Sequence, residues 1–346
     1  MREHYEAFLE AWLAPAAARS QHAERRRAEE PSPVRTAFQR DRDRVVHSQA
    51  FRRLKSKTQV FLPPSGDHVR TRLTHTLEVT QIARTITRAL HLNEDLTEAI
   101  GLAHDLGHTP FGHAGEQALA GVYPGFRHNE QSLRIVDCLE KDGRGLNLTG
   151  DTRDGILRHS KPETHIEGEV TGRPATAEAQ VVKISDGISY ISHDLDDARS
   201  AGYLLDRPLP SNVEAVLGTR HSQRIDTLVR SVIEHSRPLV QQPVDGRQVI
   251  VIGSDELRAA DELRRYLFEE LYAPINSLPS TQHAREIVVR LFEYYSDHPG
   301  EATAGAPEYL DTAAARRAAA DFVSGMTDTF ARRKYDQLFV PRFEEI

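Results

Sequence analysis

Residues 103–116 read AHDLGHTPFGHAGE and carry three histidines and one aspartate within ten positions. An apolar run at 99–103 leads into this stretch, and Gly107 predicts the end of a helix that has His104 and Asp105 in its last turn. A histidine beside an aspartate supplies two metal ligands of different charge in adjacent positions. The stretch therefore indicates a metal-dependent hydrolase.

Helical periodicity continues on both sides of this stretch. Apolar residues recur at helical spacing, and the expected helices cover residues 3–14, 41–57, 71–91, 93–106, 128–140, 149–159, 176–201, 254–272, 281–297 and 307–335, with a further one beginning near 113. The segment 248–252 (QVIVI) is the best strand candidate, because it is short and β-branched. The sequence predicts an all-α fold with at most a short β-hairpin, in which a helical core carries additional C-terminal helices.

Two connecting segments stand out from this helical pattern. Two prolines and a glycine in residues 63–66 predict a turn. Residues 160–174 contain two prolines and alternating charges, and they predict an exposed loop that is a natural place for a mobile lid.

Composition bounds the class of protein. A chain of 346 residues is long enough for one large core or two smaller ones. A net charge of -7 argues against whole-surface affinity for nucleic acid, although a local basic cluster could still hold phosphates. The single cysteine, Cys138, excludes an intrachain disulfide and a thiolate-rich zinc site, and we expect it to be buried. Without a long apolar run or a signal peptide, the expected location is the cytoplasm, with no membrane partner.

The distribution of expected helices and motifs divides the chain into three parts. Residues 1–33 are expected to form an N-terminal helix and a charged linker. Residues 34–205 carry nearly all the motifs and are expected to form the catalytic core. Residues 206–346 are expected to form a C-terminal helical portion that packs on the core and is a candidate for oligomer contacts.

More distant residues complete a metal constellation. His75 lies on a preceding helix and Asp186 on a later one, which gives the order H…HD…D. Two imidazoles and two carboxylates suit a borderline or moderately hard divalent ion, with coordination positions left for water and a substrate oxygen. A second pair, His193-Asp194, shows that the dipeptide alone carries little information. The apolar helix before it and the glycine after it favour the pair at His104.

Nine short motifs occur in order along the chain. They are RDRDR at 40–44, HSQAFRRL at 47–54, KTQV at 57–60, GDH at 66–68, RTRLTH at 70–75, the stretch at 103–116, HNEQS at 128–132, GLNLT at 145–149 and HDLDD at 193–197. Together they closely resemble the bacterial dGTPase-like family of HD-domain deoxynucleoside triphosphate triphosphohydrolases. The resemblance is dense from residue 34 to 205 and resumes weakly at 326–328 (MTD).

This resemblance implies an α-helical HD-domain core and a reaction. The reaction is metal-dependent hydrolysis of a dNTP to a deoxynucleoside plus inorganic triphosphate by attack at the α-phosphorus. The resemblance also implies that His75, His104, Asp105 and Asp186 are the metal ligands. Gly187 stands where many relatives carry an acidic residue, so the surroundings of Asp186 differ in this chain.

Acid and base roles follow from the same motif. His113 and Glu116 are three residues apart and share a face of the helix expected there, so the carboxylate can orient the imidazole. By resemblance they are the catalytic pair, and His128 and His108 are phosphate or proton-network groups, with His128 counted among the catalytic residues. For His128 and His108, packing or helix capping stays an alternative to a role in catalysis or phosphate binding.

Basic and aromatic side chains are candidates for contacts with substrate phosphate and sugar. Arg72 precedes the first histidine ligand by three positions, and a forked guanidinium suits the oxygens of a triphosphate. Arg53 is a second candidate, with ordinary pairing to carboxylates as the alternative. Tyr190 and Asp194 follow Asp186 by one and two helical turns. Tyr190 could pack on deoxyribose and exclude a 2′-hydroxyl, and a core tyrosine is the alternative.

Several points stay open at this level. The ion could be manganese, magnesium, cobalt, iron or nickel, and a second magnesium ion could arrive with the nucleotide. The resemblance implies a homo-oligomer and leaves open a nucleotide effector or single-stranded DNA at a second site. The alternative function is an HD phosphohydrolase acting on a nucleoside monophosphate or a nucleotide second messenger. A non-enzymatic dNTP sensor finds little support, because every candidate ligand is intact.

Overall fold

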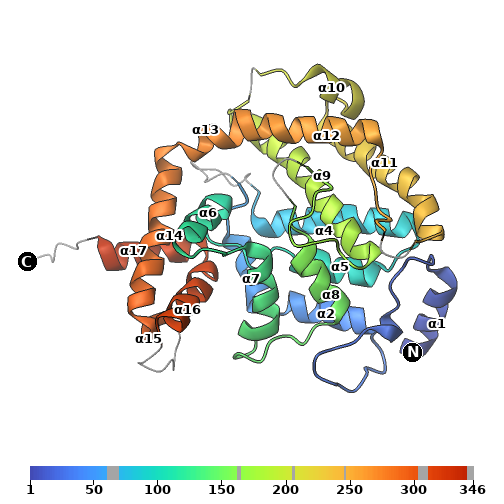
Figure 1. Cartoon of the computed structure of the whole chain (residues 1–346), viewed down its shortest axis with the longest axis horizontal. Coiled ribbons are helices and arrows are strands. Elements are labelled where there is room, and N and C mark those ends of the chain that lie inside the picture. Colours follow the sequence, from blue (N-terminus) through green and yellow to red (C-terminus); the bar gives the residue numbers. More distant parts are fainter. Residues whose placement is uncertain (61–69, 162–164, 205–206, 245–246, 303–310, 341–346) are drawn as a thin grey trace, which may run out of the picture.

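A computed structural model describes residues 1–60, 70–161, 165–204, 207–244, 247–302 and 311–340. The fold is helical (Figure 1), and in these ranges the only β contacts are two isolated bridges, Arg25 with Thr149 and Thr58 with Thr71. The predicted all-α class is confirmed. The turn predicted at 63–66 lies outside the described residues.

Three helices that carry the motifs pack against one another in the centre of the molecule. They are α4 Arg72–Ala89, α5 Glu94–Ala103 and α9 Ala177–Ser200. Ile86 of α4 and Ile188 of α9 are fully buried in their shared core. Burying one such side chain stabilises the fold by roughly 1.5–3 kcal/mol, so apolar packing holds these three helices at fixed relative positions.

Further helices surround this centre. They are α1 Arg2–Trp12, the 3-10 turns Ser20–His22 and Leu54–Ser56, α2 Ala37–Val46, α3 Gln49–Arg53, α6 Gly112–Val122, α7 His128–Arg134 with the π-turn Ile135–Leu139, α8 Gly150–Arg158, α10 Ser211–Leu217 and α11 His221–Gln241. Helix α2 packs on α5, and α8 packs on α9. Apolar residues of α10 and α11 belong to the same core as α4 and α9. The domain limits at 33 and 205 stay predictions.

Polar side chains set the starts of the site-bearing helices. Thr71, Asn93, Thr149 and Thr176 precede α4, α5, α8 and α9, and each accepts a hydrogen bond from the backbone N–H three residues on. Such caps satisfy a donor that the helix itself leaves free, and each contributes about 1 kcal/mol. The sequence therefore fixes where these helices begin.

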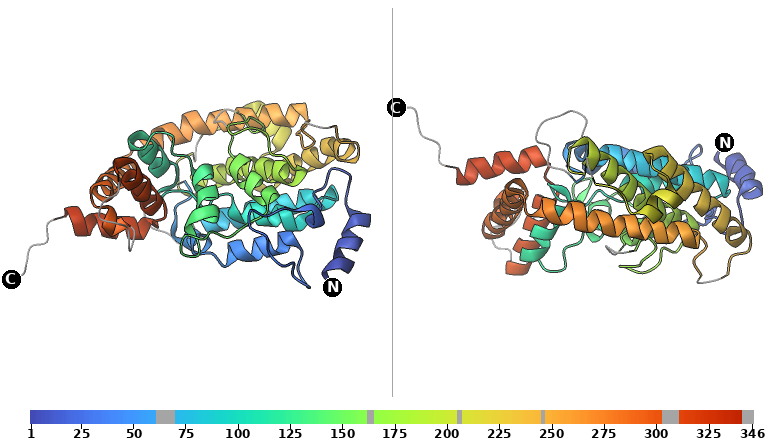
Figure 2. Two further views of the ribbon diagram at one scale, coloured as in Figure 1. Left: turned by 60° about the horizontal axis from the view of Figure 1, so that its bottom comes forward. Right: turned by 90° about the horizontal axis from the view of Figure 1, so that it is seen from above.

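The C-terminal helices begin with α12 along one side of the core. They end with α14 to α17 at the end of the molecule opposite the N-terminus (Figures 1 and 2). They are α12 Ser254–Leu267, the π-turn Phe268–Tyr272, α13 Ala273–Asn276, α14 Pro279–Asp297, α15 Pro299–Ala302, α16 Thr312–Ser324 and α17 Asp328–Phe339. Helix α12 packs on α9 and α10. Helices α14, α16 and α17 share a second core with Phe111, Leu119 and Phe126, which lie in and beside α6.

Two helices expected as single elements are each divided in two. The helix expected at 41–57 becomes α2 and α3 because Ser48 caps a new start by accepting from the Phe51 N–H. The helix expected at 307–335 becomes α16 and α17 in its described part, because Thr327 caps a second start.

The strand expected at 248–252 does not form. Side chains take the place of a partner strand: the Ile250 N–H donates to Gln180 Oε1 at 3.2 Å, and the Ile252 N–H donates to Glu167 Oε1 at 2.8 Å. Val249, Ile250 and Ile252 of this segment are buried in the main core. Backbone donors satisfied by side chains leave no need for a sheet.

The described part of the segment 160–174 is a loop, as expected, with His165, Glu169, Val170 and Arg173 exposed, and its role as a lid stays a prediction. One residue of it is anchored in the core. Ile166 is fully buried, and its N–H donates to Asp261 Oδ1 on α12 at 3.0 Å. An ideal Cβ at Gly187 would lie only 2.8 Å from Ile166 Cγ2. The absence of a side chain at Gly187 therefore allows the segment to pack closely on α9.

Cys138 is exposed, contrary to expectation. It lies in a π-turn whose buried residues are Ile135 and Val136, so the turn presents it to the outside. Among the described helices, none combines the length and the apolar character that crossing a membrane would require.

Candidate active site

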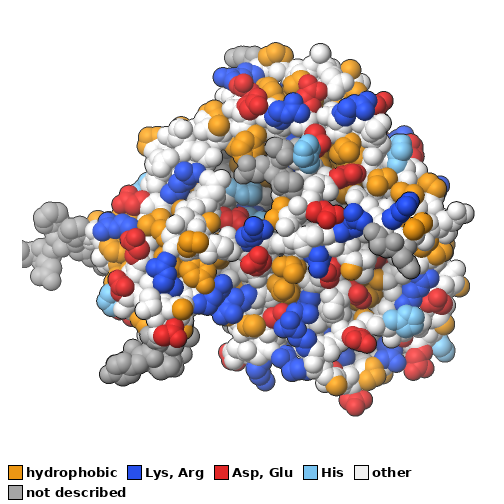
Figure 3. Space-filling view, in the orientation of Figure 1, with side chains coloured by type: hydrophobic (Ala, Val, Ile, Leu, Met, Phe, Trp, Pro, Cys, Tyr) orange, Lys and Arg blue, Asp and Glu red, His pale blue; other side chains and the backbone are white. Residues whose placement is uncertain are grey.

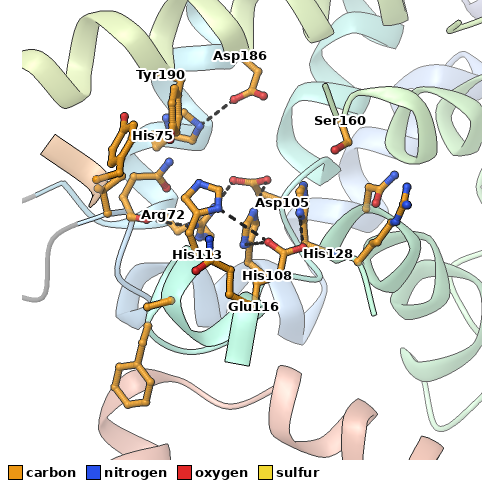
Figure 4. Close-up of a pocket in the computed structure, with 18 of the residues that line it drawn as sticks. Arg72, His75, Asp105, His108, His113, Glu116, His128, Ser160, Asp186 and Tyr190 are labelled. Atoms are coloured by element: carbon orange, nitrogen blue, oxygen red, sulfur yellow. Dashed lines mark hydrogen bonds and ion pairs between the residues drawn. The ribbon is translucent and has the colours of Figure 1, made fainter. Parts of the chain in front are cut away.

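A cavity of about 350 Å³ lies where α4, α6, α7 and α9 converge beside α12 and α13. Figure 3 shows this face hollowed near α6, with histidine side chains visible in the hollow. In Figure 4 the labelled side chains from these elements point toward a common space. Most of the residues selected from the sequence line this cavity: Arg72, His75, Asp105, His108, His113, Glu116, His128, Asp186 and Tyr190.

His75, His104 and Asp186 form one group that could hold a metal ion. Their ligand atoms all lie within 4.8 Å of one another, and His75 Nε2 is 3.2 Å from Asp186 Oδ1. Burial alone would raise the pKa of Asp186, but Lys161 and His75 beside it hold that pKa well below its usual range. The carboxylate is therefore ionised and available to a cation.

The His104 imidazole is oriented so that its unprotonated nitrogen faces two carboxylates. Its Nδ1 donates to the Gly101 carbonyl oxygen at 2.7 Å, which leaves the lone pair on Nε2, and burial lowers the pKa of the ring. Nε2 is buried without a hydrogen-bond partner, 3.5 Å from Asp105 Oδ1 and 3.9 Å from Asp186 Oδ1. A buried lone pair facing carboxylates needs a cation between them, so these residues fit a divalent metal ion.

Gly107 allows α7 to approach this group closely. A Cβ there would lie 2.2 Å from Ser132 N and 2.3 Å from His128 O. The Gly107 N–H donates to Ser132 Oγ at 2.8 Å, and that hydroxyl donates to the His104 carbonyl oxygen at 2.7 Å. The sequence predicts His104 and Asp105 in the last turn of a helix. Helix α5 instead ends at Ala103, so both residues lie in the turn that follows it.

Asp105, His108 and His128 form a second group with ligand atoms within 4.8 Å of one another. His108 Nε2 is 3.3 Å from Asp105 Oδ1, and the His108 ring stacks on His128 with centroids 4.0 Å apart. Asp105 thus lies between the two groups, with His104 on one side and His108 on the other. This second group can accept another cation or, through protonated imidazole, a phosphate oxygen.

Glu116 pairs with His128 more closely than with His113. Its Oε1 accepts from His128 Nδ1 at 2.8 Å, whereas Oε2 is 3.9 Å from His113 Nδ1. Burial would lower the pKa of His128, but Glu116 outweighs it and the pKa is raised. Burial lowers the pKa of His113, although 43% of this side chain reaches solvent at the cavity mouth. Glu116 thus orients His128 directly, whereas its orientation of His113, which lies at the limit of ion-pair distance, stays a prediction.

Arg72 is buried beside the metal group. Its side chain is 1% exposed, its Nη1 donates to Asp105 Oδ2 at 2.6 Å, and its Nη2 donates to the Gln59 carbonyl oxygen at 3.1 Å. Nε is buried without a hydrogen-bond partner. Arg72 therefore fixes one oxygen of Asp105 while the other faces the histidines, and its guanidinium borders the cavity.

Aromatic rings form another wall of the cavity. Tyr190 and Tyr272 lie with ring centroids 5.5 Å apart, and the Arg264 guanidinium lies 5.2 Å from the Tyr190 ring centre. Tyr272 Oη donates to Asp194, whose pKa burial raises to about 7. Asp194 is thus behind the wall, while Tyr190 faces the cavity.

Arg53 is not brought to this cavity. It lies at the end of α3, and its Nη1 donates to the Gly325 carbonyl oxygen at 3.3 Å. The structure thus places it against the turn between α16 and α17.

Two further side chains at the cavity were missed from the sequence. His159 Nε2 is 3.1 Å from His128 Nε2, and Lys161 Nζ forms an ion pair with Asp186. Both line the cavity. The signal was a histidine and a lysine at 159–161 (HSK), directly after a helix that ends near the other motifs.

Comparison with known proteins defines the class. The HD domain family model matches residues 72–191, and the phosphohydrolase-associated domain model matches residues 250–337. The first contains His75, His104, Asp105 and Asp186, and HD domains bind divalent metals. The helical fold, the two histidine–aspartate groups and these matches define an HD-domain phosphohydrolase.

Whole-chain relatives give the family. A deoxyguanosinetriphosphate triphosphohydrolase-like protein of Caldanaerobacter subterraneus subsp. tengcongensis is 49% identical over 95% of this chain and 93% of its own length. Proteins of the same name from Desulfatibacillum aliphaticivorans and Clostridium perfringens (strain SM101) are 46% and 42% identical, over 99% and 92% of this chain and 98% and 91% of theirs. The chain belongs to the dGTP triphosphohydrolase-like family, which confirms the resemblance seen in the motifs.

Proposed function

We propose that this protein hydrolyses deoxynucleoside triphosphates to deoxynucleoside and inorganic triphosphate, by attack of water at the α-phosphorus. The observation that carries the proposal is the unpaired His104 Nε2, which faces Asp105 and Asp186 at the edge of a cavity that also holds cationic and proton-transferring groups. Family membership supports the choice of nucleotide.

His75, His104, Asp105 and Asp186 would hold a divalent ion, which lowers the pKa of a bound water and neutralises charge on a phosphoryl oxygen. Nitrogen and oxygen donors in this mixture are compatible with manganese, magnesium, cobalt, iron or nickel. The second group, with His108 and Asp105, offers a place for a magnesium ion carried by the nucleotide.

Proton chemistry would come from His113, Glu116 and His128. Glu116 raises the pKa of His128, which favours the protonated imidazole and therefore a contact with phosphate. His113 is the most accessible of the three, and an anionic phosphate beside it would oppose the effect of burial on its pKa. His113 can then hold the proton that the sugar 5′-oxygen takes as it leaves.

Cationic side chains at the cavity fit a triphosphate, which carries about four negative charges near neutral pH. Arg72 and Lys161 both border the space in front of the metal group. Each also contacts a carboxylate of that group, Arg72 with Asp105 and Lys161 with Asp186. Substrate phosphates would compete for these two cations and so be drawn next to the predicted metal ligands.

Selection of deoxyribose would rest on Tyr190. Its ring lies 5.5 Å from the Tyr272 ring and 5.9 Å from the His113 ring, measured between centroids, with the Arg264 guanidinium on its face. Asp194 supports this wall through the Tyr272 hydroxyl. A sugar packed on Tyr190 leaves little room for a 2′-hydroxyl, so we expect dGTP to be hydrolysed much faster than GTP. Equal turnover of the two would refute this part of the proposal.

Chromatography of the products from each of the four dNTPs, with several divalent ions, tests the proposal. We expect intact triphosphate and the matching deoxynucleoside, and no activity after chelation. The His104→Ala and Asp105→Ala variants should be inactive. Release of orthophosphate from a nucleoside monophosphate, with no triphosphate from any dNTP, would instead support the alternative substrate class.

We also propose, from family membership, that the protein acts in the cytoplasm as a homo-oligomer. The exposed parts of residues 206–346 are the candidate contact region. Light scattering of the purified chain tests the second statement, and a monomer at micromolar concentration during turnover would refute it.

A further inference from the structure

The turn between α16 and α17 contacts the active-site segment through three residues of an early motif. Arg53 donates to the Gly325 carbonyl oxygen, and Lys57 Nζ donates to the carbonyl oxygens of Ser324 and His108. Thr58 donates to Asp328 through both its N–H, at 3.0 Å, and its hydroxyl. Arg53 belongs to the motif at 47–54, Lys57 and Thr58 to the motif at 57–60, and Asp328 to the motif at 326–328. The proposed chemistry leaves these motifs without a role.

Asp328 also contacts the loop that joins His108 to His113. Its Oδ1 accepts from the Phe111 N–H at 3.0 Å. Phe111 has φ +65° and Gly112 has φ +57°, so two successive residues of this loop are in the left-handed region. A phenylalanine in that region is strained, and such strain persists only where surrounding contacts impose it.

The loop is tightly enclosed as well as strained. A Cβ at Gly112 would lie 2.6 Å from the Gln59 carbonyl oxygen and 3.4 Å from Arg72 Nη2. The next residue is His113, which lies in the first turn of α6, lines the cavity and is partly exposed. The conformation at Phe111 and Gly112 therefore sets the direction in which His113 leaves the loop.

Lys57 secures the other end of the same loop. Its side chain is buried, with the residue 2% exposed, and its ammonium bridges the His108 carbonyl oxygen to the Ser324 carbonyl oxygen. A buried ammonium that bonds two carbonyls is costly to displace. His108 and Phe111 are thus both held by groups that also bind the turn at 324–328.

We propose that Asp328 is a positioning residue for the active site: it holds the His108 to His113 loop in its left-handed conformation, so the C-terminal helices complete the catalytic machinery. The inference rests on the proposed function only for the choice of assay substrate. Docking of the C-terminal helices does not require it, because α14, α16 and α17 already share an apolar core with Leu119 and Phe126.

Replacement of Asp328 by asparagine tests this role. All three of its partners, Thr58 N–H, Thr58 hydroxyl and Phe111 N–H, are donors, so an amide nitrogen would face a donor. We expect kcat for dGTP to fall about 10–100-fold with KM little changed, as for other residues that orient catalytic groups. The variant Thr58→Val removes one hydroxyl that binds Asp328 and leaves the carboxylate in place. A kcat equal to that of the wild type in this variant would separate support of the loop from docking of the C-terminal helices.

Asp321→Asn is the matched control. Asp321 lies on α16 and binds Arg134 and Gln131 of α7, so this variant loses a docking contact of similar kind without touching the loop. We expect a similar change in Tm for the two variants and a loss of kcat only in Asp328→Asn. Equal losses of kcat in both would overturn the proposal.

Hydrogen exchange read by mass spectrometry gives a second, activity-independent measurement. In Asp328→Asn, amides in residues 108–113 should exchange at least about tenfold faster, with α4 and α9 unchanged. Unchanged exchange in residues 108–113 would also overturn the proposal. If the wild-type chain hydrolyses no dNTP, the proposed substrate is wrong, and the exchange experiment still decides the role of Asp328.

Discussion

Glu178 is a buried carboxyl group outside the candidate active site, and the pH dependence of stability tests its environment. It lies in the first turn of α9 and is fully buried. Its Oε1 accepts from the N–H groups of Ala18 and Asn93 at 3.0 and 2.8 Å, and its Oε2 has no hydrogen-bond partner. Burial raises its pKa from 4.5 to about 7, against the lowering effect of the backbone N–H groups of Asn93, Ala18 and Glu178 itself. Replacement by glutamine keeps the accepting oxygen and removes the ionisation.

The sign of the pH dependence follows from this direction of shift. A folded-state pKa above the unfolded value means that the folded chain prefers the protonated carboxyl. That contribution to stability is fully present below about pH 4.5, is lost as the pH rises toward 7, and is absent above it. With pKa values of 4.5 unfolded and about 7 folded, the wild type should lose about 2 kcal/mol of stability relative to Glu178→Gln between pH 5 and 7.

Urea unfolding of both proteins at pH 5, 6, 7 and 8 measures this difference. Subtracting the two curves removes the titration of groups common to both chains, while any fixed cost of the new amide shifts all points equally. The exposed Glu234 provides a control, and Glu234→Gln should show no such trend. A difference between wild type and Glu178→Gln that stays constant from pH 5 to 8 would show that the carboxyl is not held protonated.

Three further outcomes are expected at the site. His104→Ala should lose bound metal, measured by elemental analysis after gel filtration, and more than about 100-fold in kcat/KM; retained metal would refute its assignment. Gly107→Ala should destabilise the fold by about 1–3 kcal/mol or more in urea unfolding, because its Cβ would overlap Ser132 N, and a wild-type midpoint would contradict the packing. Lys161→Gln should raise KM for dGTP about tenfold, whereas Lys183→Gln, one turn from Asp186 and outside the cavity, should not. Equal KM values for these two variants would remove Lys161 from the phosphate site.

Local sequence signals were sufficient for most of the helices. Apolar spacing gave the existence of α4, α5 and α9, and the structure shows that Thr71, Asn93 and Thr176 cap their starts. The strand expected at 248–252 failed for a tertiary reason. Its backbone donors are taken by side chains of Gln180 and Glu167, which belong to distant segments.

The predicted site divides in the same way. Residue types and order were enough to select His75, His104, Asp105 and Asp186, and the fold brings all four side chains into one region. Spacing along one helix suggested that Glu116 orients His113. The close partner is instead His128, because the N-terminus of α7 lies against that carboxylate.

The sequence by itself determined the helical class, the family and the candidate metal ligands, because periodicity and dense motifs are properties of neighbouring residues. Tertiary structure alone decided which side chains meet: Lys161 with Asp186, His159 with His128, and Asp328 with the Phe111 N–H. The last of these pairs residues 217 positions apart. No local pattern encodes such a contact, since it depends on how the apolar faces of all the intervening helices pack.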